Sequence, residues 1–150
     1  MGENWPAGVR EGLEADVRRV ADRLRTLSEA QLTAPAPPHP SRVAGGRALA
    51  QVLAVAAQGI EDRAGAEEPQ WRRVPDIADL IVGDQVAVTG NDLLALLPTT
   101  LATTSSTGDH ARAGILVSPE ETVWAPGARR TAGEVVADAA AQLAALRQAL

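Results

Sequence analysis

Residues 82–97, VGDQVAVTGNDLLALL, decide the fold that we predict for this chain. Their apolar residues recur at intervals of three and four, which is the period of an amphipathic α-helix. At about 100° per residue, Val82, Val86 and Leu93 fall on one face. The stretch therefore predicts a helix that packs against others through this face.

A polar trio borders the apolar face of that helix. Gln85 lies about 40° and Asp92 about 60° around the helix from Thr89, whereas Asp84 and Asn91 point the opposite way. One interpretation is that Gln85 and Thr89 hydrogen-bond to each other or to backbone carbonyls, as buried polar groups generally do. The other is that they line a small-molecule pocket. Both stay open at the level of sequence.

Three further helices are predicted around this one. The first covers roughly residues 6–29, and the second runs over about 43–63 and is apolar on most of its circumference. The helix of the opening stretch should begin at Asp76, which can cap it, and the last begins at the T-x-x-E capping box of Thr131 and Glu134. Four helices without internal repeats predict an all-α fold, a four-helix bundle formed by one domain, residues 1–150.

The connections are less regular. Four prolines within residues 32–41 predict an extended link between the first two helices. Residues 99–113 are small and polar, which favours a mobile loop. Between the third and fourth helices, two alternatives remain: a small β-hairpin whose strands flank a turn at residues 118–121, or a short helix capped by Ser118 with Pro119 in its first position.

Composition limits both the core and the chemistry. Hydrophobic residues make up 45% of the chain, with three Trp and no Phe or Tyr, so the core must be aliphatic. The absence of Cys excludes disulfides, thiolate metal sites and a Cys nucleophile. His39 and His110 lie in predicted loops, so neither sits on a rigid element next to another potential metal ligand. These observations favour neither a redox enzyme nor a metalloenzyme.

Charge and hydropathy bear on partners and location. The net charge is −5, and all fourteen basic residues are Arg without a basic block, so we expect no nucleic-acid binding. Apolar runs such as ALAQVLAVAA, residues 48–57, are much shorter than the ~20 residues of a membrane span. No basic, apolar leader follows Met1. We therefore expect a soluble, cytoplasmic protein without membrane contact.

Two motifs resemble a known family. LRTLSEAQLTAP, residues 24–35, precedes the Pro-rich link and the apolar second helix, and VTGNDLLALL, residues 88–97, lies on the third. This order resembles the DinB-like superfamily, in particular the N-terminal domain of mycothiol-dependent maleylpyruvate isomerases and their actinobacterial relatives. The resemblance spans residues 10–97 and implies a four-helix bundle.

The resemblance also implies a lost metal site. In that family, a divalent metal is held by a His on the second helix and a Glu-x-x-x-His pair on the third. Matched motif to motif, the ligand positions fall on Val55, Gln85 and Thr89, and the Asp that follows the family's His matches Asp92, for which we expect a structural role near the bundle interior. Val has no donor atom, and Gln and Thr are neutral, so the resemblance implies no metal, no cofactor and no catalytic residue.

The expected function follows from this loss. We expect a metal-free, non-catalytic bundle that acts as a small-ligand or protein-interaction module, with Val55, Gln85, Thr89 and Asp92 around a degenerate, candidate ligand-binding pocket. The alternative is a thiol-cofactor (mycothiol)-dependent isomerase or transferase. A homodimer is also expected, because the Ala-rich faces of the second and fourth helices exceed what one core needs.

Overall fold

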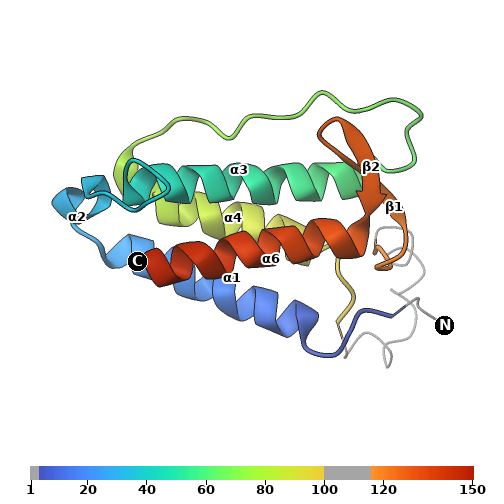
Figure 1. Cartoon of the computed structure of the whole chain (residues 1–150), viewed down its shortest axis with the longest axis horizontal. Coiled ribbons are helices and arrows are strands. Elements are labelled where there is room, and N and C mark those ends of the chain that lie inside the picture. The colour runs from blue at the N-terminus through green and yellow to red at the C-terminus, as the bar shows by residue number, and fades with distance from the viewer. Residues whose placement is uncertain (1–3, 100–115) are drawn as a thin grey trace.

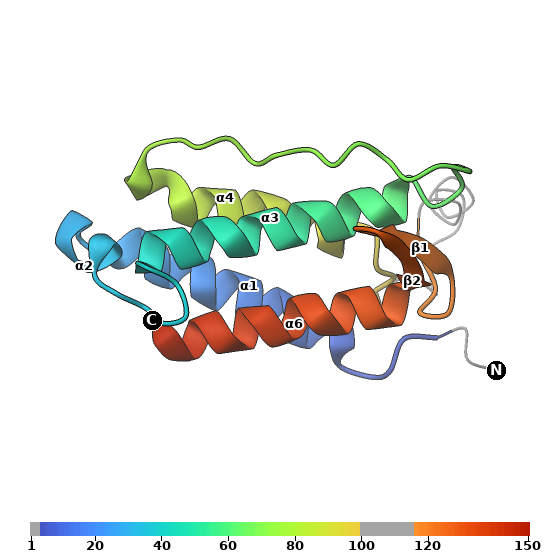
Figure 2. The same cartoon turned by 45° about the horizontal axis from the view of Figure 1, so that its top comes forward.

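The computed structural model describes residues 4–99 and 116–150, and these are mostly helical with one small two-stranded antiparallel sheet. The helical class predicted from the sequence is therefore confirmed. Four longer helices lie alongside one another (Figures 1 and 2): α1 (Val9–Thr26), α3 (Arg42–Glu61), α4 (Val82–Leu94) and α6 (Ala132–Ala149). The short helices α2 (Glu29–Thr33) and η1 (Asp79–Ile81) precede α3 and α4.

The four longer helices contact one another in the cyclic order α1, α4, α3, α6. Helices α3 and α4 run in the same direction, whereas α1 and α6 run the opposite way (Figure 1). Two parallel neighbours cannot be joined by a tight turn, so the chain returns along the whole length of α3 before α4 begins. We call residues 62–78, which make this return, the crossover segment (Figure 2).

The core between the helices is aliphatic, as composition predicted. Each longer helix contributes a leucine that is at most 2% exposed: Leu24, Leu53, Leu93 and Leu143. Val82 and Val86 are also buried, which confirms the face predicted for the opening stretch. Gly90 lets α4 approach α1 closely, because a Cβ at this position would lie 2.5 Å from Cγ1 of Val17.

The helix boundaries follow local hydrogen bonding. The capping box predicted at the start of α6 is present: Glu134 N donates to the Thr131 hydroxyl, and Thr131 N to the Glu134 carboxylate. The first predicted helix was too long, because Ser28 forms a second capping box with Gln31 and begins α2 there. The chain therefore turns after Thr26.

The third helix begins at Val82 rather than at Asp76, so the predicted start was wrong. Residues 76–78 still belong to the extended crossover segment. The reason is a set of contacts with α3: the Arg47 guanidinium donates to the Ile77 carbonyl at 2.6 Å and to the Asp79 carboxylate at 2.7 Å. Arg47 also forms an ion pair with Asp76. These contacts hold the chain extended past the expected cap.

A β-hairpin precedes α6, formed by β1 (Thr122–Ala125) and β2 (Ala128–Thr131). A hairpin in this region is thus confirmed, but its predicted strands and turn were wrong, because residues 116–117 are not in a strand, and the short-helix alternative does not occur at Ser118. The strands flank residues 126–127, where Gly127 supplies a φ of 78° that other residues rarely adopt. Ser118 instead starts a turn before β1, in which Glu121 N donates to the Ser118 carbonyl.

Two further expectations concern membrane contact and the loop at residues 99–113. Helix α3 is long and apolar enough to cross a membrane, with a mean hydropathy of 1.3, but 61% of that window is buried by the rest of the structure. This burial is typical of the core helix of a soluble protein. The expected mobile loop, residues 99–113, lies outside the described residues except for Thr99.

Candidate functional site

Two glutamines of α3 hold the crossover segment against the helices. Gln51 donates to the Arg72 carbonyl and accepts from Val74 N, both at 2.8 Å. Gln58 donates to the Gln70 carbonyl at 2.8 Å and accepts from Arg72 N at 2.9 Å. Each side-chain amide therefore donates one hydrogen bond to the backbone of the extended chain and accepts one from it, as the backbone of a neighbouring β-strand would.

This arrangement depends on the spacing of the two glutamines. Seven residues apart, they stand two turns from each other on the same side of α3. Their amides can consequently bracket Arg72, whose N–H and carbonyl are both used. The crossover segment is thereby fixed without a second strand.

We expect Gln58→Leu to lower the free energy of unfolding by about 1–3 kcal/mol, because it leaves the polar groups of Gln70 and Arg72 without their partner. Urea denaturation measures the change. Amide hydrogen exchange should accelerate at Arg72 in the variant, whereas Val74, held by Gln51, serves as the internal control. Unchanged protection at Arg72 would contradict this account of the crossover segment.

A pocket of about 380 Å³ lies between α3, α4 and the crossover segment. Its walls are mainly apolar and include Ala54, Ala57, Ile81 and Val88. Within the described ranges, the buried polar residues are Gln58, Gln85 and Thr89, and all three line this pocket. The buried polarity of the structure is therefore concentrated in one place, which we call the α3/α4 pocket.

Gln85 is the residue of this pocket that has a buried side-chain atom without a hydrogen-bond partner among the described residues. Its side-chain Nε2 donates to the Pro75 carbonyl at 2.6 Å, which fixes the orientation of the amide because only a donor can face a carbonyl. Its Oε1 is buried and accepts no hydrogen bond from residues 4–99 or 116–150. Gln85 is only 8% exposed, so this oxygen has lost water without gaining a partner.

Thr89 is satisfied by its own helix. Its hydroxyl donates to the Gln85 carbonyl at 2.8 Å, with the Val86 carbonyl at 3.3 Å. Thr89 and Gln85 thus both bond to backbone carbonyls, as the first interpretation predicted, and both line a pocket, whose use by a small molecule stays a prediction. Asp92 also lines the pocket but is exposed, and it makes no side-chain hydrogen bond to a described residue. Its expected place near the bundle interior was wrong.

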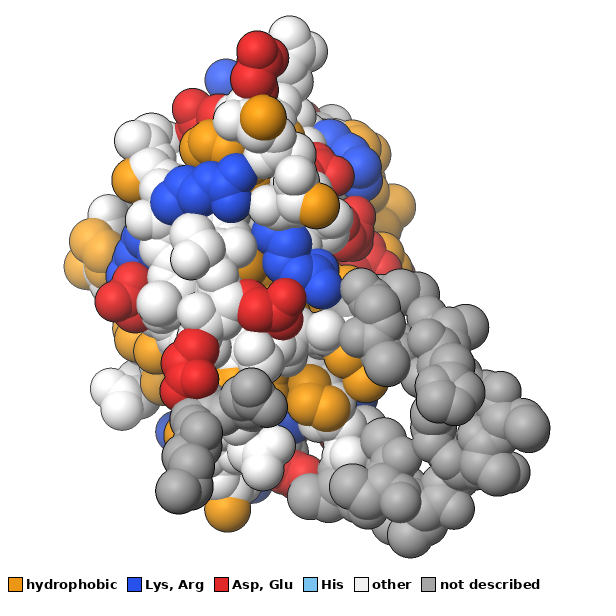
Figure 3. Space-filling model, turned by 90° about the vertical axis from the view of Figure 1, so that its right-hand side faces the viewer, with side chains coloured by type: hydrophobic (Ala, Val, Ile, Leu, Met, Phe, Trp, Pro, Cys, Tyr) orange, Lys and Arg blue, Asp and Glu red, His pale blue; other side chains and the backbone are white. Residues whose placement is uncertain are grey.

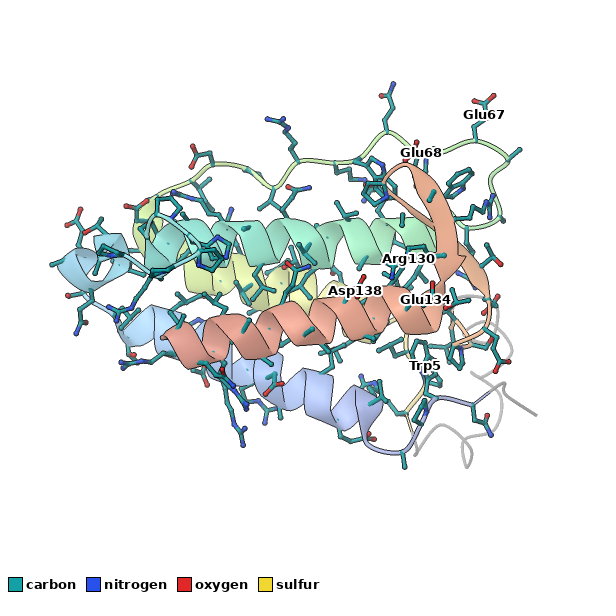
Figure 4. The ribbon with its side chains drawn as sticks, viewed as in Figure 1. Trp5, Glu67, Glu68, Arg130, Glu134 and Asp138 are labelled. Atoms are coloured by element: carbon teal, nitrogen blue, oxygen red, sulfur yellow. The ribbon has the colours of Figure 1, made fainter. Side chains whose placement is uncertain are left out.

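Val55 does not join the other three residues. It lines a separate pocket of about 340 Å³ on the side of α3 that faces α6 and the hairpin. Consecutive helical residues differ by about 100°, so Ala54 faces the α3/α4 pocket and Val55 turns away from it. In the Val55 pocket, Arg130 is paired with Glu134 and Asp138 (Figure 4), and the hydrogen bond to Asp138 raises the pKa of Arg130.

The residues at the expected metal position do not fit a divalent ion. Gln85 and Thr89 offer one amide oxygen and one hydroxyl, and Val55 lies in another pocket. Throughout the described part of the chain, no group of three or more His, Asp or Glu side chains is placed to hold a metal. The polar groups of the α3/α4 pocket are suited to hydrogen bonding.

A separate group of contacts fixes the hairpin to the crossover segment. The Glu68 carboxylate accepts from Gly127 N at 2.6 Å and from the Trp71 indole at 3.2 Å. Arg129 donates to the Gly65 carbonyl at 2.6 Å and lies 4.0 Å from the ring centre of Trp124. On this end of the molecule, acidic and basic side chains are interspersed (Figure 3).

The Glu68 contact should make hairpin docking sensitive to acid. The hydrogen bond from Gly127 N, followed by that from Trp71, lowers the pKa of the Glu68 carboxyl. A group with a lowered pKa stabilises the fold above its unfolded-state pKa, and this contribution is lost as pH falls through the lowered value. We expect the exchange of Gly127 N, corrected for intrinsic pH dependence, to lose protection at acid pH. In Glu68→Gln that pH dependence should disappear; its persistence would contradict the assignment.

The roles of Gln51 and Gln58 were missed in the sequence, although a signal was present. Both are polar residues on the helix predicted to be the most apolar, seven positions apart. A polar pair with this spacing on a buried helix indicates a partner along that face.

No family model, characterised protein or solved structure matches the chain.

Proposed function

We propose that this protein is a metal-free, non-catalytic, DinB-like four-helix bundle of the cytoplasm. Its proposed role is to bind a small ligand in the α3/α4 pocket. The observation that carries the proposal is the α3/α4 pocket itself, whose mainly apolar walls include the three buried polar side chains Gln58, Gln85 and Thr89. Small-molecule sites typically combine apolar walls with a few polar groups. A small, largely apolar ligand would be stabilised there by the burial of apolar surface.

The size and composition of the pocket support the same proposal. Its volume of about 380 Å³ falls within the range of roughly 300–1,000 Å³ that is typical of small-molecule sites. Three of the four exposed large hydrophobic residues of the described structure, Ile77, Ile81 and Val88, also line it. These side chains would be covered by an apolar ligand.

A thermal-shift screen with small apolar compounds tests the proposal. Ligands of the α3/α4 pocket should raise the melting temperature of the parent protein but not of Ala54→Leu, in which a larger side chain fills the pocket. The matched control is Val55→Leu, one residue further along α3, which borders the other pocket and should respond as the parent does. Equal responses in both variants would contradict this location.

The thiol-cofactor-dependent isomerase or transferase is the rival function. Adding divalent metals and thiol compounds to the same screen distinguishes this enzyme from the proposed binding module. A stoichiometric metal response would favour the enzyme, whereas a response to apolar ligands alone favours the binding module.

We also propose that the protein forms a homodimer. Exposed alanines along α6, among them Ala141 and Ala145, support close packing against a second copy. Light scattering at high micromolar concentration should give twice the mass of the chain, and a monomer under these conditions would contradict the proposal.

A further inference from the structure

We infer that the outer edge of the crossover segment binds an extended, acidic peptide of a partner protein, which pairs with it as an added β-strand. The edge is the backbone of residues 70–74, QWRRV. Both views of the ribbon show the crossover segment on the outside of the molecule, along α3 (Figures 1 and 2). This interaction goes beyond the proposed function and does not depend on a ligand in the α3/α4 pocket.

The backbone of this stretch alternates in direction, as it does in a β-strand. The carbonyls of Gln70 and Arg72 and the N–H groups of Arg72 and Val74 all bond to the two glutamines of α3. Successive residues of an extended chain direct their backbone polar groups to opposite sides. The N–H and carbonyl groups of Trp71 and Arg73 therefore face away from α3. None of these four groups is hydrogen-bonded within the described part of the chain.

The side chains of the stretch alternate as well. Arg72 lines the α3/α4 pocket, whereas Trp71 lines a different pocket of about 490 Å³ beside it, and Arg73 borders both. Consecutive side chains of a strand point to opposite faces in this way. The segment thus has the form of an edge strand whose inner side is bonded and whose outer side is free.

Two prolines limit the length of this free edge. Pro69 and Pro75 have no N–H, so the outward donors between them are those of Trp71 and Arg73. An antiparallel strand placed here would exchange an N–H···O bond in each direction with both residues. Exposed edges of this kind bind extended peptides by β-strand addition. The partner is therefore a short peptide, because pairing cannot continue past the prolines.

The charge of the edge selects an acidic partner. Residues 70–74 contain two arginines and no acidic side chain. Both arginines are exposed, and neither side chain forms an ion pair within the described structure. The nearest acidic residue on each side is already engaged: Glu68 accepts from Gly127 N, and Asp76 is paired with Arg47. Carboxylates of a bound peptide would therefore find two free guanidinium groups.

Antiparallel pairing also predicts the order of side chains in the peptide. Residues directly opposite each other on two strands have their side chains on the same face. Along the peptide, the residues opposite Arg73, Arg72 and Trp71 follow one another, so we expect two acidic residues and then an apolar one. Two copies of this segment paired about Arg72 would place like charges opposite each other, which disfavours self-association through this edge.

The peptide acetyl-Thr-Glu-Glu-Val-Thr-amide tests the inference in an NMR titration of the parent protein. It should shift the backbone amide resonances of Trp71 and Arg73 more than those of Arg72 and Val74, whose N–H groups are already bonded to α3. Replacing both Glu of the peptide by Gln should raise the Kd by at least about threefold, because two exposed ion pairs are lost.

N-methylated peptides test the strand pairing itself. In the expected register, Val lies opposite Trp71 and its N–H faces the crossover segment, whereas the N–H of the second Glu faces away. Methylation of the Val nitrogen should raise the Kd by at least about tenfold, and methylation of the second Glu nitrogen should change it by less than about twofold. An equal effect at both positions would overturn the inference, because charge alone would then explain the binding.

Two protein variants locate the site. Arg73→Gln should weaken binding of the peptide by about two- to threefold. The matched control is Arg19→Gln, which removes another exposed arginine without an ion pair in the described structure, on α1, and should bind as the parent does. An equal loss in both variants would overturn the inference.

Two further results would contradict the peptide-binding edge. One is the absence of binding at millimolar peptide. The other is a shift of the Trp71 and Arg73 amide resonances when the protein concentration alone is raised, since a second copy would then occupy the edge. Neither result bears on the thermal-shift screen of the α3/α4 pocket, so failure of this inference and failure of the proposed function are distinguishable.

Discussion

Replacing Gly59 with alanine should lower the free energy of unfolding by about 3 kcal/mol, a large effect for the addition of one methyl group. Gly59 lies near the end of α3, directly below the hairpin. A Cβ at this position would lie 2.0 Å from the carbonyl oxygen of Trp124 and 3.0 Å from its carbonyl carbon. Both atoms belong to the β1 backbone, so the conflict cannot be relieved by rotating a side chain.

The strand would have to move away from α3. This movement would disturb the contacts that fix the hairpin, including those of Glu68 with Gly127 and of Arg129 with Gly65. Urea denaturation measures the loss, and hydrogen exchange at the hairpin should show it locally. The matched control is Gly12→Ala on the exposed side of α1, where a Cβ meets nothing within 4 Å. This change should stabilise the helix by about 0.5–1 kcal/mol.

A Gly59→Ala protein as stable as the parent would show that the hairpin does not rest on α3 at this point. The comparison with Gly12 removes the general effect of glycine on helices, since both replacements are made inside a helix. Any difference between them must come from what lies outside the helix.

The helices were predictable because their signals are local. Apolar periodicity identified the buried face of α4, and the side chains of Thr131 and Glu134 alone define the start of α6. A hairpin was predictable in this region but its strands and turn were not, because residues on both sides of 118–121, such as Val117 and Val123, suit a strand equally well. Gly127, with its positive φ, was the more informative residue there.

The crossover segment was not predictable in the same way. Its extended form depends on side chains of α3 and α4 that are distant in sequence, such as Gln51 and Gln85. The late start of α4 has the same origin, because Arg47 holds residues that could otherwise have joined the helix. Local propensity contains no information about these partners.

For the candidate site, periodicity was more reliable than motif matching. The helical angle between Gln85 and Thr89 correctly placed both on one buried side, where each lines the α3/α4 pocket. Val55 was grouped with them by its position in a motif, without regard to which side of α3 it occupies. The residue of α3 that lines the pocket at this level is Ala54.

The triple change Val55→His, Gln85→Glu and Thr89→His should cost about 3–5 kcal/mol of stability and should not be rescued by zinc. The new carboxylate would face the Pro75 carbonyl without a donor, and the Gln85 carbonyl would lose its bond from the Thr89 hydroxyl. Were the three positions one metal site, they would give zinc the three protein ligands of an open site.

Zinc at 100 times its dissociation constant would then restore about 2.7 kcal/mol. Because Val55 lies in a different pocket, we expect the triple variant to respond to zinc no more than the double variant Gln85→Glu and Thr89→His. Moving the third imidazole by one residue, to Ala54→His, places all three ligands around the α3/α4 pocket and should produce the zinc response. Melting temperatures with and without zinc distinguish these cases. A response from the Val55 variant but not from the Ala54 variant would mean that motif matching, rather than the helix face, had identified the correct residue of α3.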